Sequence, residues 1–166
     1  LFNNPAADII VGPGNQFVTV AKQKSTQFGV AIDMPAGPSE LLIVADESAN
    51  SSFIASDLLS QAEHGTDSQV ILVSTSKRLI DEVSEEVAIQ LEVLPRKAIV
   101  EKAIANSKLI YVENDDIALE LINEYGPEHF TICCENEDLY IDGIKNAGSV
   151  FIGDYTPESA GDYASG

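Results

Sequence analysis

The sequence predicts an α/β fold in which a mainly parallel β-sheet carries helices on both faces. Short apolar, β-branched runs alternate along the chain with longer amphipathic runs, which is the pattern of successive strand–helix units. The chain has 166 residues and is 45% hydrophobic, enough for one domain with a full core. These observations together favour a globular fold that is Rossmann-like but incomplete.

Each element follows from a local pattern. Buried strands are expected at six apolar runs, residues 7–12, 41–46, 69–75, 108–113, 129–134 and 149–153. A helix is expected over 50–64, because Asn50 or Ser51 can cap it and Phe53, Ile54, Leu58 and Gln61 recur at helical spacing. Further helices are expected at 77–94, where Pro95 ends the run, and at 96–106, 115–125 and 137–147.

Two stretches break this alternation. Residues 33–40 hold two prolines and a glycine between apolar runs, which predicts a shaped loop or hinge. Residues 153–166 are polar and glycine-rich without periodicity, and a domain rarely ends on such residues unless they lie against something. We therefore expect the chain to be part of a longer one, and expect residues from about Tyr155 onward to be loosely held.

Charge and cysteine usage restrict the partners and the compartment. Twenty-seven acidic residues against nine basic ones give a net charge of −18, which opposes binding to nucleic acid or an acidic membrane. Cys133 and Cys134 are adjacent, so they would point to opposite faces of a strand and form no disulfide. No run of membrane-spanning length and no signal peptide is present. We expect a cytoplasmic protein.

Gln61 and His64 form the first candidate site. They stand three residues apart at a helix end, so they can share a face. An imidazole beside oxygen donors suits zinc, and Asp154 or Asp162 could add a carboxylate. Because ligands of open α/β sheets bind beyond the carboxyl ends of strands, we expect these groups at that edge. An ordinary polar helix end explains the same spacing, and both explanations stay open.

Three further positions carry possible chemistry. Glu128 and His129 are adjacent at a turn into a strand, where they suit proton transfer. The GPGN loop with Asn15 offers backbone N–H groups to an anion but is not a full dinucleotide fingerprint. Ser39 could donate a hydrogen bond to a ligand or cap the next strand.

Read together, these pieces resemble one family along essentially the whole chain. GPGNQFVTVAK, AIDMPAGPSELL, ASDLLSQAEHGTDSQVILV, YGPEHF and NAGSVFIGDYTPESAGDYASG are similar, in this order, to histidinol dehydrogenase. The resemblance covers an internal to later part of that longer family sequence. It implies a two-step oxidation of L-histidinol through L-histidinal to L-histidine, with zinc and two NAD.

The resemblance also implies a role for each candidate residue. Gln61, His64 and Asp162 match zinc ligands that also contact substrate, while a fourth ligand lies outside this chain. Glu128 and His129 match the acid–base pair, and His129 also contacts substrate. Ser39 matches a substrate contact of the family, and Asn15 matches an NAD contact.

The family's organisation is implied as well. Residues 1–40 would be the tail of an NAD-side domain with a hinge at 33–40, and residues 41–166 a Rossmann-like half carrying the zinc and acid–base residues. The active site would be shared across a homodimer, so this chain alone would be inactive. Two other interpretations stay open: a non-catalytic α/β interaction module, and a metal-dependent hydrolase using Gln61, His64 and Asp162.

Overall fold

The computed structural model describes residues 7–12, 16–33 and 39–159. The chain divides into two compact units, Leu1–Pro38 and Ser39–Gly166. The helices of the described residues include none that is long and apolar enough to cross a bilayer.

The smaller unit consists of one helix and a two-stranded parallel sheet. Strand β1 (Ile9–Ile10) pairs with β2 (Ala31–Ile32), and α1 (Gln16–Thr26) connects them. The buried Lys22 ammonium binds the Asp33 carboxylate at 2.6 Å and the Gly12 carbonyl. The prediction of a buried strand over 7–12 was wrong in length and burial, and a second strand was missed. The run at 7–12 is short and exposed because one helix cannot cover both faces of so small a sheet, and the strand at 31–32 was not anticipated.

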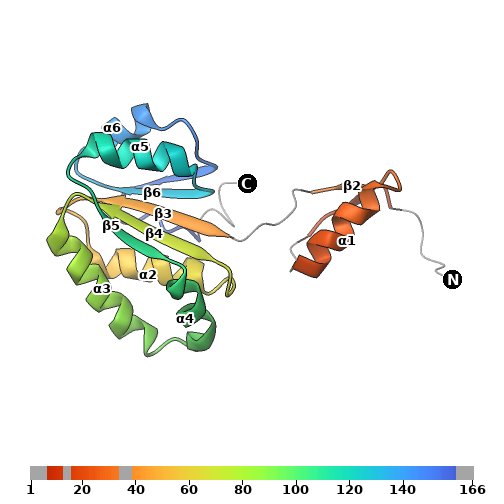
Figure 1. Cartoon of the computed structure of the whole chain (residues 1–166), viewed down its shortest axis with the longest axis horizontal. Helices are drawn as coiled ribbons and strands as arrows, with labels where there is room; N and C mark the ends of the chain where they lie inside the picture. Colours follow the sequence, from red (N-terminus) through yellow and green to blue (C-terminus); the bar gives the residue numbers. More distant parts are fainter. Residues whose placement is uncertain (1–6, 13–15, 34–38, 160–166) are drawn as a thin grey trace. The chain divides into compact units, whose positions relative to one another are not determined.

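The larger unit is built on a five-stranded, all-parallel sheet within the described residues. The strands lie side by side in the order β5 (Lys108–Tyr111), β4 (Gln69–Ser74), β3 (Glu40–Ala45), β6 (His129–Cys133) and β7 (Ser149–Ile152). In sequence order the sheet begins with the central strand β3, continues outward through β4 to β5, and then crosses to the other side with β6 and β7 (Figure 1). This is the strand order of a Rossmann half, in which the order reverses between β3 and β6 while all strands stay parallel.

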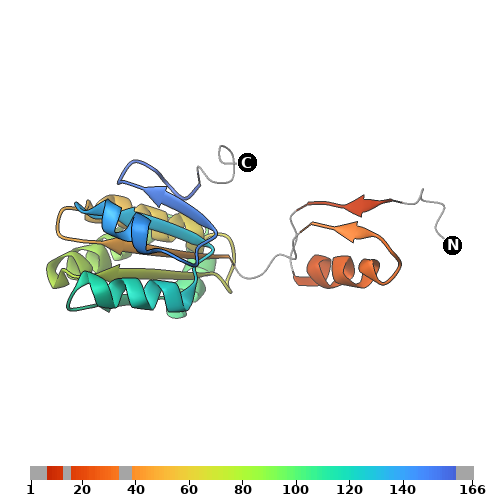
Figure 2. The same ribbon diagram turned by 90° about the horizontal axis from the view of Figure 1, so that it is seen from above.

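Helices cover both faces of this sheet, as Figures 1 and 2 show. Residues Leu41 and Ile43 of β3 pack in a core with α2 (Ser51–Ala62), α3 (Lys77–Leu91) and α4 (Lys97–Ala105). Their neighbours Leu42 and Val44 pack instead with α5 (Asp115–Tyr125) and α6 (Glu137–Gly143). Successive residues of a strand thus pack into two different cores, one on each face of the sheet. The predicted α/β class is confirmed.

The start of α2 determines where its far end lies. The Asn50 side chain accepts hydrogen bonds from the backbone N–H groups of Ser52 and Phe53, so the helix begins soon after the carboxyl end of β3. A helix that follows a parallel strand runs back along the sheet. The last turn of α2, which carries Gln61, therefore lies at the edge where the strands begin, called the amino edge below.

Candidate functional site

The candidate residues described by the structure gather at the amino edge of the larger sheet. Ser39 directly precedes β3, His129 opens β6, and Gln61 lies in the last turn of α2. The expectation that Gln61 and His64 would lie at the carboxyl edge was wrong. It placed these residues by the general rule for ligand positions, whereas the expected helix, now α2, carries them back along the length of the sheet.

Strand register places His129 on the α2 side of the sheet. Leu41 pairs with His129, and Leu41 belongs to the core beneath α2. Phe130 belongs to the opposite core and Cys133 to the α2 core, so His129 alternates onto the α2 face. The same alternation from Leu41 puts Ser39 on this face. One face of one edge thus presents Ser39, His129 and the end of α2.

Gln61 is the most unusual polar side chain at this edge. It is fully buried, yet neither its amide oxygen nor its amide nitrogen has a hydrogen-bond partner among the described residues. A buried polar group without a partner costs about 1–3 kcal/mol. His64 follows two residues after the helix with an exposed side chain, and its N–H closes a turn onto the Gln61 carbonyl at 3.2 Å. The pair combines a buried amide with an accessible imidazole.

His129 is held in one orientation by two neighbours. Its Nδ1 lies 3.1 Å from the Glu40 carbonyl oxygen, and its ring stacks on Phe151 with centroids 6.2 Å apart. A carbonyl oxygen only accepts, so Nδ1 must carry the proton and Nε2 of the neutral ring keeps its lone pair. The side chain is 15% exposed, which leaves Nε2 a path to a ligand. This arrangement is that of an oriented general base.

Glu128 is more open than its neighbour. Its side chain is 48% exposed, and its Oε2 lies 4.0 Å from His129 Nδ1. The Glu40 carbonyl is closer to that nitrogen at 3.1 Å, so it is the partner that orients the ring. The Glu128 carboxylate remains accessible to water and to a ligand, as a water-activating group requires.

The backbone around Glu128 is fixed by contacts that sequence reasoning missed. Gly126 ends α5 in the left-handed conformation with φ of 64°, where glycine is favoured. The Ser149 N–H donates to the Glu128 carbonyl at 2.8 Å. A Cβ at Gly148 would lie 2.5 Å from that same carbonyl oxygen, so only glycine fits there. The glycine before the expected strand at 149–153 was the available signal.

The remaining candidate residues are less informative. The Ser39 carbonyl accepts from the Gln69 N–H at 3.3 Å, and its side chain is half-buried. Asn15 and Asp162 lie outside the described residues. Asp154 lies close to Cys133 at the carboxyl end of β6, where burial and then the Asp154 charge raise the pKa of that thiol. This is away from Gln61, so Asp154 is not the carboxylate that joins Gln61. Within the described ranges, no three His, Cys, Asp or Glu side chains are grouped to hold a metal ion.

Both cysteines are unreactive core thiols. Cys133 is buried and Cys134 half-buried, and they belong to opposite cores. Burial raises the pKa of the Cys134 thiol to about 12, with the charge of Asp46 acting in the same direction. Burial also raises the pKa of Cys133 strongly. Neither thiol is suited to act as a nucleophile at neutral pH.

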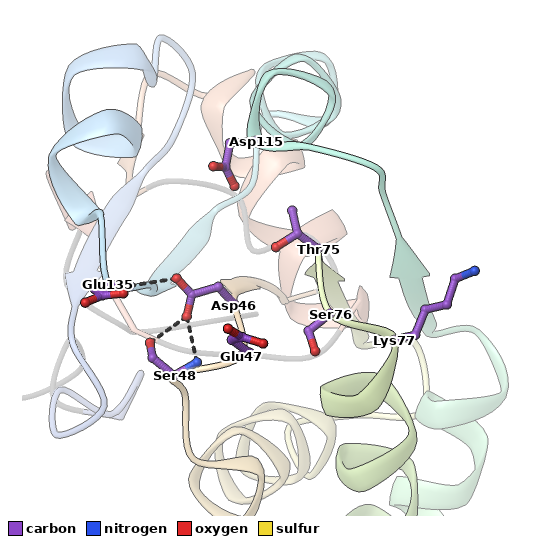
Figure 3. A pocket seen from close by; sticks show the side chains of 8 residues that line it. All are labelled: Asp46, Glu47, Ser48, Thr75, Ser76, Lys77, Asp115 and Glu135. Carbon is purple, nitrogen blue, oxygen red and sulfur yellow. Dashed lines mark hydrogen bonds between the residues drawn. The ribbon is translucent and has the colours of Figure 1, made fainter.

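The opposite edge of the sheet holds a cavity of about 470 Å³, the carboxyl-edge pocket (Figure 3). It lies at the carboxyl ends of β3 and β6, where the strand order reverses, the usual ligand position in such sheets. Its lining residues come from the loops after β3, β4, β5 and β6 and are Asp46, Glu47, Ser48, Thr75, Ser76, Lys77, Asp115 and Glu135. Four carboxylates against one lysine make it a poor site for a phosphate group.

The polar groups at the centre of this pocket are engaged with one another. The Asp46 carboxylate accepts from the Ser48 N–H at 2.9 Å, from the Ser48 hydroxyl and from the Glu135 N–H at 2.8 Å (Figure 3). Burial opposes ionisation of Asp46, but these hydrogen bonds outweigh it and lower its pKa. Asp46 therefore ties two loops together.

Comparison with known proteins identifies relatives of the whole chain. Residues 3–166 match the family model described as histidinol dehydrogenase. The histidinol dehydrogenase of Pseudoalteromonas translucida is 56% identical over 164 residues, and that of Bacteroides thetaiotaomicron is 59% identical over 157 residues. A crystal structure of histidinol dehydrogenase from Elizabethkingia anophelis superposes with a TM-score of 0.92 at 52% identity.

These relatives are much longer than the chain. The alignments cover 98% of this chain but 38% of the Pseudoalteromonas protein and 37% of the Elizabethkingia chain. The Bacteroides alignment covers 95% of this chain and 37% of that relative.

Proposed function

This chain belongs to the histidinol dehydrogenase family, and from that premise we propose that it forms the α/β part of a zinc-dependent, NAD-dependent enzyme. The proposed reaction oxidises L-histidinol through L-histidinal to L-histidine, as the last steps of histidine biosynthesis in the cytoplasm. The observation that supports it best is the amino edge itself. There, one face combines a buried amide that has no partner among the described residues with an oriented imidazole.

The residues at the end of α2 fit a zinc ion. Gln61 would contribute its amide oxygen, which has no partner among the described residues, and His64 an accessible imidazole nitrogen. Asp162, outside the described residues, would add a carboxylate, completing three N/O donors of the kind that catalytic zinc takes. Zinc bound there would hold the amino and imidazole nitrogens of the substrate in place.

His129 would accept the protons that are released in both oxidations. With Nδ1–H donated to the Glu40 carbonyl, the Nε2 lone pair accepts the hydroxyl proton of L-histidinol while the carbinol carbon loses a hydride to NAD. The product is L-histidinal. Ser39, on the same face, would hold the substrate by a hydrogen bond.

Glu128 would act in the second oxidation. Its exposed carboxylate takes a proton from water as the water oxygen attacks the aldehyde carbon. After releasing the first proton to solvent, His129 would accept a proton of the resulting hydrate, and with a second NAD as the hydride acceptor the product would be the carboxylate of L-histidine. Separate roles follow from separate environments, because Glu128 faces solvent whereas His129 is packed against Phe151.

The rest of the site would come from outside this chain. Asn15 contributes one NAD contact, and the remaining NAD contacts and the fourth zinc ligand belong to other parts of the longer polypeptide and to the second subunit of a homodimer. Under this proposal residues 1–40 are the tail of the NAD-side domain.

One comparison tests the proposal. The grafted enzyme is a chimera in which this chain replaces the matched 164-residue segment of the Pseudoalteromonas relative. We expect the grafted enzyme to form NADH from L-histidinol and the 166-residue chain alone to form none and to be isolated without zinc. Turnover by the chain alone would show that the site has been misplaced, and an inactive but folded grafted enzyme would contradict the assigned activity.

A further inference from the structure

Glu40 contacts both ends of the turn that leads into the proposed acid–base pair. The turn comprises residues 126–128, between Tyr125, the last residue of α5, and His129, the first residue of β6. On one side, the Tyr125 hydroxyl donates a hydrogen bond to the Glu40 carboxylate at 2.8 Å. On the other side, His129 Nδ1 lies 3.1 Å from the Glu40 carbonyl oxygen. One residue at the start of β3 thus brackets the turn on which Glu128 lies.

Strand alternation explains how a single residue reaches both partners. Leu41 packs in the core beneath α2, so the side chain of Glu40 lies on the opposite face, against whose core Tyr125 packs. The Glu40 carbonyl, as a backbone group of a sheet, points sideways toward a neighbouring strand. There it meets the ring of His129 in β6. The side chain of Glu40 therefore reaches α5 while its backbone reaches His129.

The Tyr125 hydroxyl is suited to donate a hydrogen bond and not to ionise. Burial raises the pKa of this phenol, and the hydrogen bond to the Glu40 carboxylate acts in the same direction. Gln69 Oε1 lies 2.7 Å from the same hydroxyl, and the Gln69 amide nitrogen donates to the Asn106 carbonyl at 3.0 Å. The hydroxyl thus faces two acceptors with one proton, and its charge makes the carboxylate the stronger acceptor.

We propose that Tyr125 is a positioning residue that acts through Glu40 to hold the His129 imidazole and the turn bearing Glu128 in the geometry for proton transfer. This inference rests on the proposed function, because it takes His129 as the base. Glu40 is the first residue of its strand, and the ends of elements open most easily. Without the hydroxyl, the Glu40 carbonyl is freer to leave Nδ1, and the ring loses its fixed orientation and tautomer.

The first test measures catalysis by variants of the grafted enzyme. Tyr125→Phe removes only the hydroxyl and should lower kcat for L-histidinol about tenfold, because the base is less well placed. KM for L-histidinol and zinc affinity, measured by competition with a chelator, should stay within about threefold. Glu40→Gln keeps an acceptor oxygen for the Tyr125 hydroxyl and should retain kcat within about threefold.

Tyr140→Phe is the matched control. The Tyr140 hydroxyl makes the same kind of hydrogen bond, 2.8 Å long, to the Asp115 carboxylate, which lines the carboxyl-edge pocket. Its loss should leave kcat unchanged, so that any effect of Tyr125→Phe is specific to the amino edge.

A double-mutant cycle shows whether Tyr125 and Glu40 act through one bond. Glu40→Ala removes the acceptor and should lower kcat about as much as Tyr125→Phe. The double variant should be no worse than either single variant, because both substitutions break the same contact. Losses that multiply would show independent effects and overturn the proposal. If Tyr125→Phe fails to fold, Glu40→Ala provides the test, since it breaks the bond from the other side.

A second readout follows the His129 ring without zinc, NAD or catalysis. The 166-residue chain has two histidines, so isotope-labelled histidine gives nitrogen NMR signals from His64 and His129 alone. In alkaline solution, where an imidazole is neutral, these signals show which ring nitrogen carries the proton. His129 should be protonated at Nδ1 in the unchanged chain and in Tyr140→Phe, but should be a mixture of both tautomers in Tyr125→Phe. The exposed His64 should not change.

The outcomes distinguish this inference from the function on which it rests. The positioning role requires both the loss of kcat and the change of tautomer in Tyr125→Phe, and either one without the other overturns it. If neither occurs while His129→Ala abolishes turnover, the positioning role is wrong and the base role of His129 stands. If His129→Ala retains turnover, the proposed base is wrong, and the role of Tyr125 in catalysis is wrong with it.

Discussion

The two edges of the same sheet differ in how their polar groups are satisfied. In the carboxyl-edge pocket, the Asp46 carboxylate has three hydrogen-bond donors. At the amino edge, Gln61 is buried with an amide that has no partner among the described residues, and His129 has one nitrogen engaged by a carbonyl. Polar groups that satisfy one another hold loops together, whereas buried groups left incomplete are suited to a ligand.

This difference matters because ligands of open parallel sheets usually bind at the carboxyl edge, not at the amino edge. The carboxyl-edge pocket lies where the strand order reverses and has a volume of about 470 Å³, yet its negative charge opposes binding of a dinucleotide. The amino edge owes its chemistry to α2, which returns Gln61 to the start of the strands. Under the proposed function, hydrogen-bond satisfaction is therefore a better guide to the site than position in the fold.

The strongest test of this comparison substitutes one residue at each edge of the sheet in the grafted enzyme. His129→Ala removes the proposed base and should lower kcat for both L-histidinol and L-histidinal by about 10²–10⁴-fold. Asp46→Ala should leave kcat within about threefold but lower the free energy of unfolding by about 1–3 kcal/mol, because its loop contacts are lost. NADH formation and urea unfolding measure the two effects. A large loss of kcat in Asp46→Ala would place function at the wrong edge.

A second test divides the work between the two acid–base residues. Glu128→Gln keeps the shape of the side chain but cannot take a proton from water. We expect a loss of about 100-fold with L-histidinal as substrate and less than tenfold with L-histidinol, since only the aldehyde step needs water. Single-turnover assays with each substrate measure this ratio. Equal losses on both substrates would remove the separate role of Glu128.

Much of the fold could be predicted from the sequence, because apolar periodicity reports directly on burial. The central strands at 41–46, 69–75 and 129–134 and the helix at 50–64 appear where expected. Local patterns failed where burial depends on distant partners. The run at 108–113 was expected to be buried but forms the mostly exposed edge strand β5.

The site was less predictable for the same reason. Motif resemblance pointed to Gln61, His64, Glu128 and His129, but not to the Glu40 carbonyl, which pairs with His129 across 89 residues. Residues from about Tyr155 onward were expected to be mobile or misplaced, and this stays a prediction. Within 155–159 the Tyr155 ring packs against Phe53 and Glu158 is buried, and no periodicity within the segment itself could reveal these contacts.

A third test addresses the backbone that supports the acid–base pair. Gly148→Ala would bring a Cβ to 2.5 Å from the Glu128 carbonyl oxygen, and the backbone must shift, which should lower stability by about 1–3 kcal/mol. Gly65→Ala is the control, because its Cβ would meet only the movable end of the Asp67 side chain at 2.7 Å. Thermal unfolding of the 166-residue chain measures both. Equal destabilisation by the two substitutions would show that the Glu128 backbone is not constrained by Gly148.

The smallest expected effect concerns the pH dependence of stability at Asp57. Its pKa is about 6 in the folded chain against 3.8 for the ordinary group, chiefly through burial and then through the charge of Glu158. The folded state therefore holds this proton more tightly than the unfolded state, so stability declines as pH rises from about 4 through 6. Asp57→Asn removes the ionisation and keeps a side chain of nearly the same shape. Above about pH 7 the Asn variant should therefore have a higher free energy of unfolding than the unchanged chain. Because the Asp57 side chain is only half-buried, solvent screening reduces this gain in stability to about 1 kcal/mol. The gain should disappear below about pH 4. Urea unfolding of the metal-free chain across this range measures it, with Asp81→Asn as the exposed control. A gain that is the same at all pH values would show that Asp57 ionises normally, and the contrast between a strained carboxylate on α2 and a satisfied one at Asp46 would then be lost.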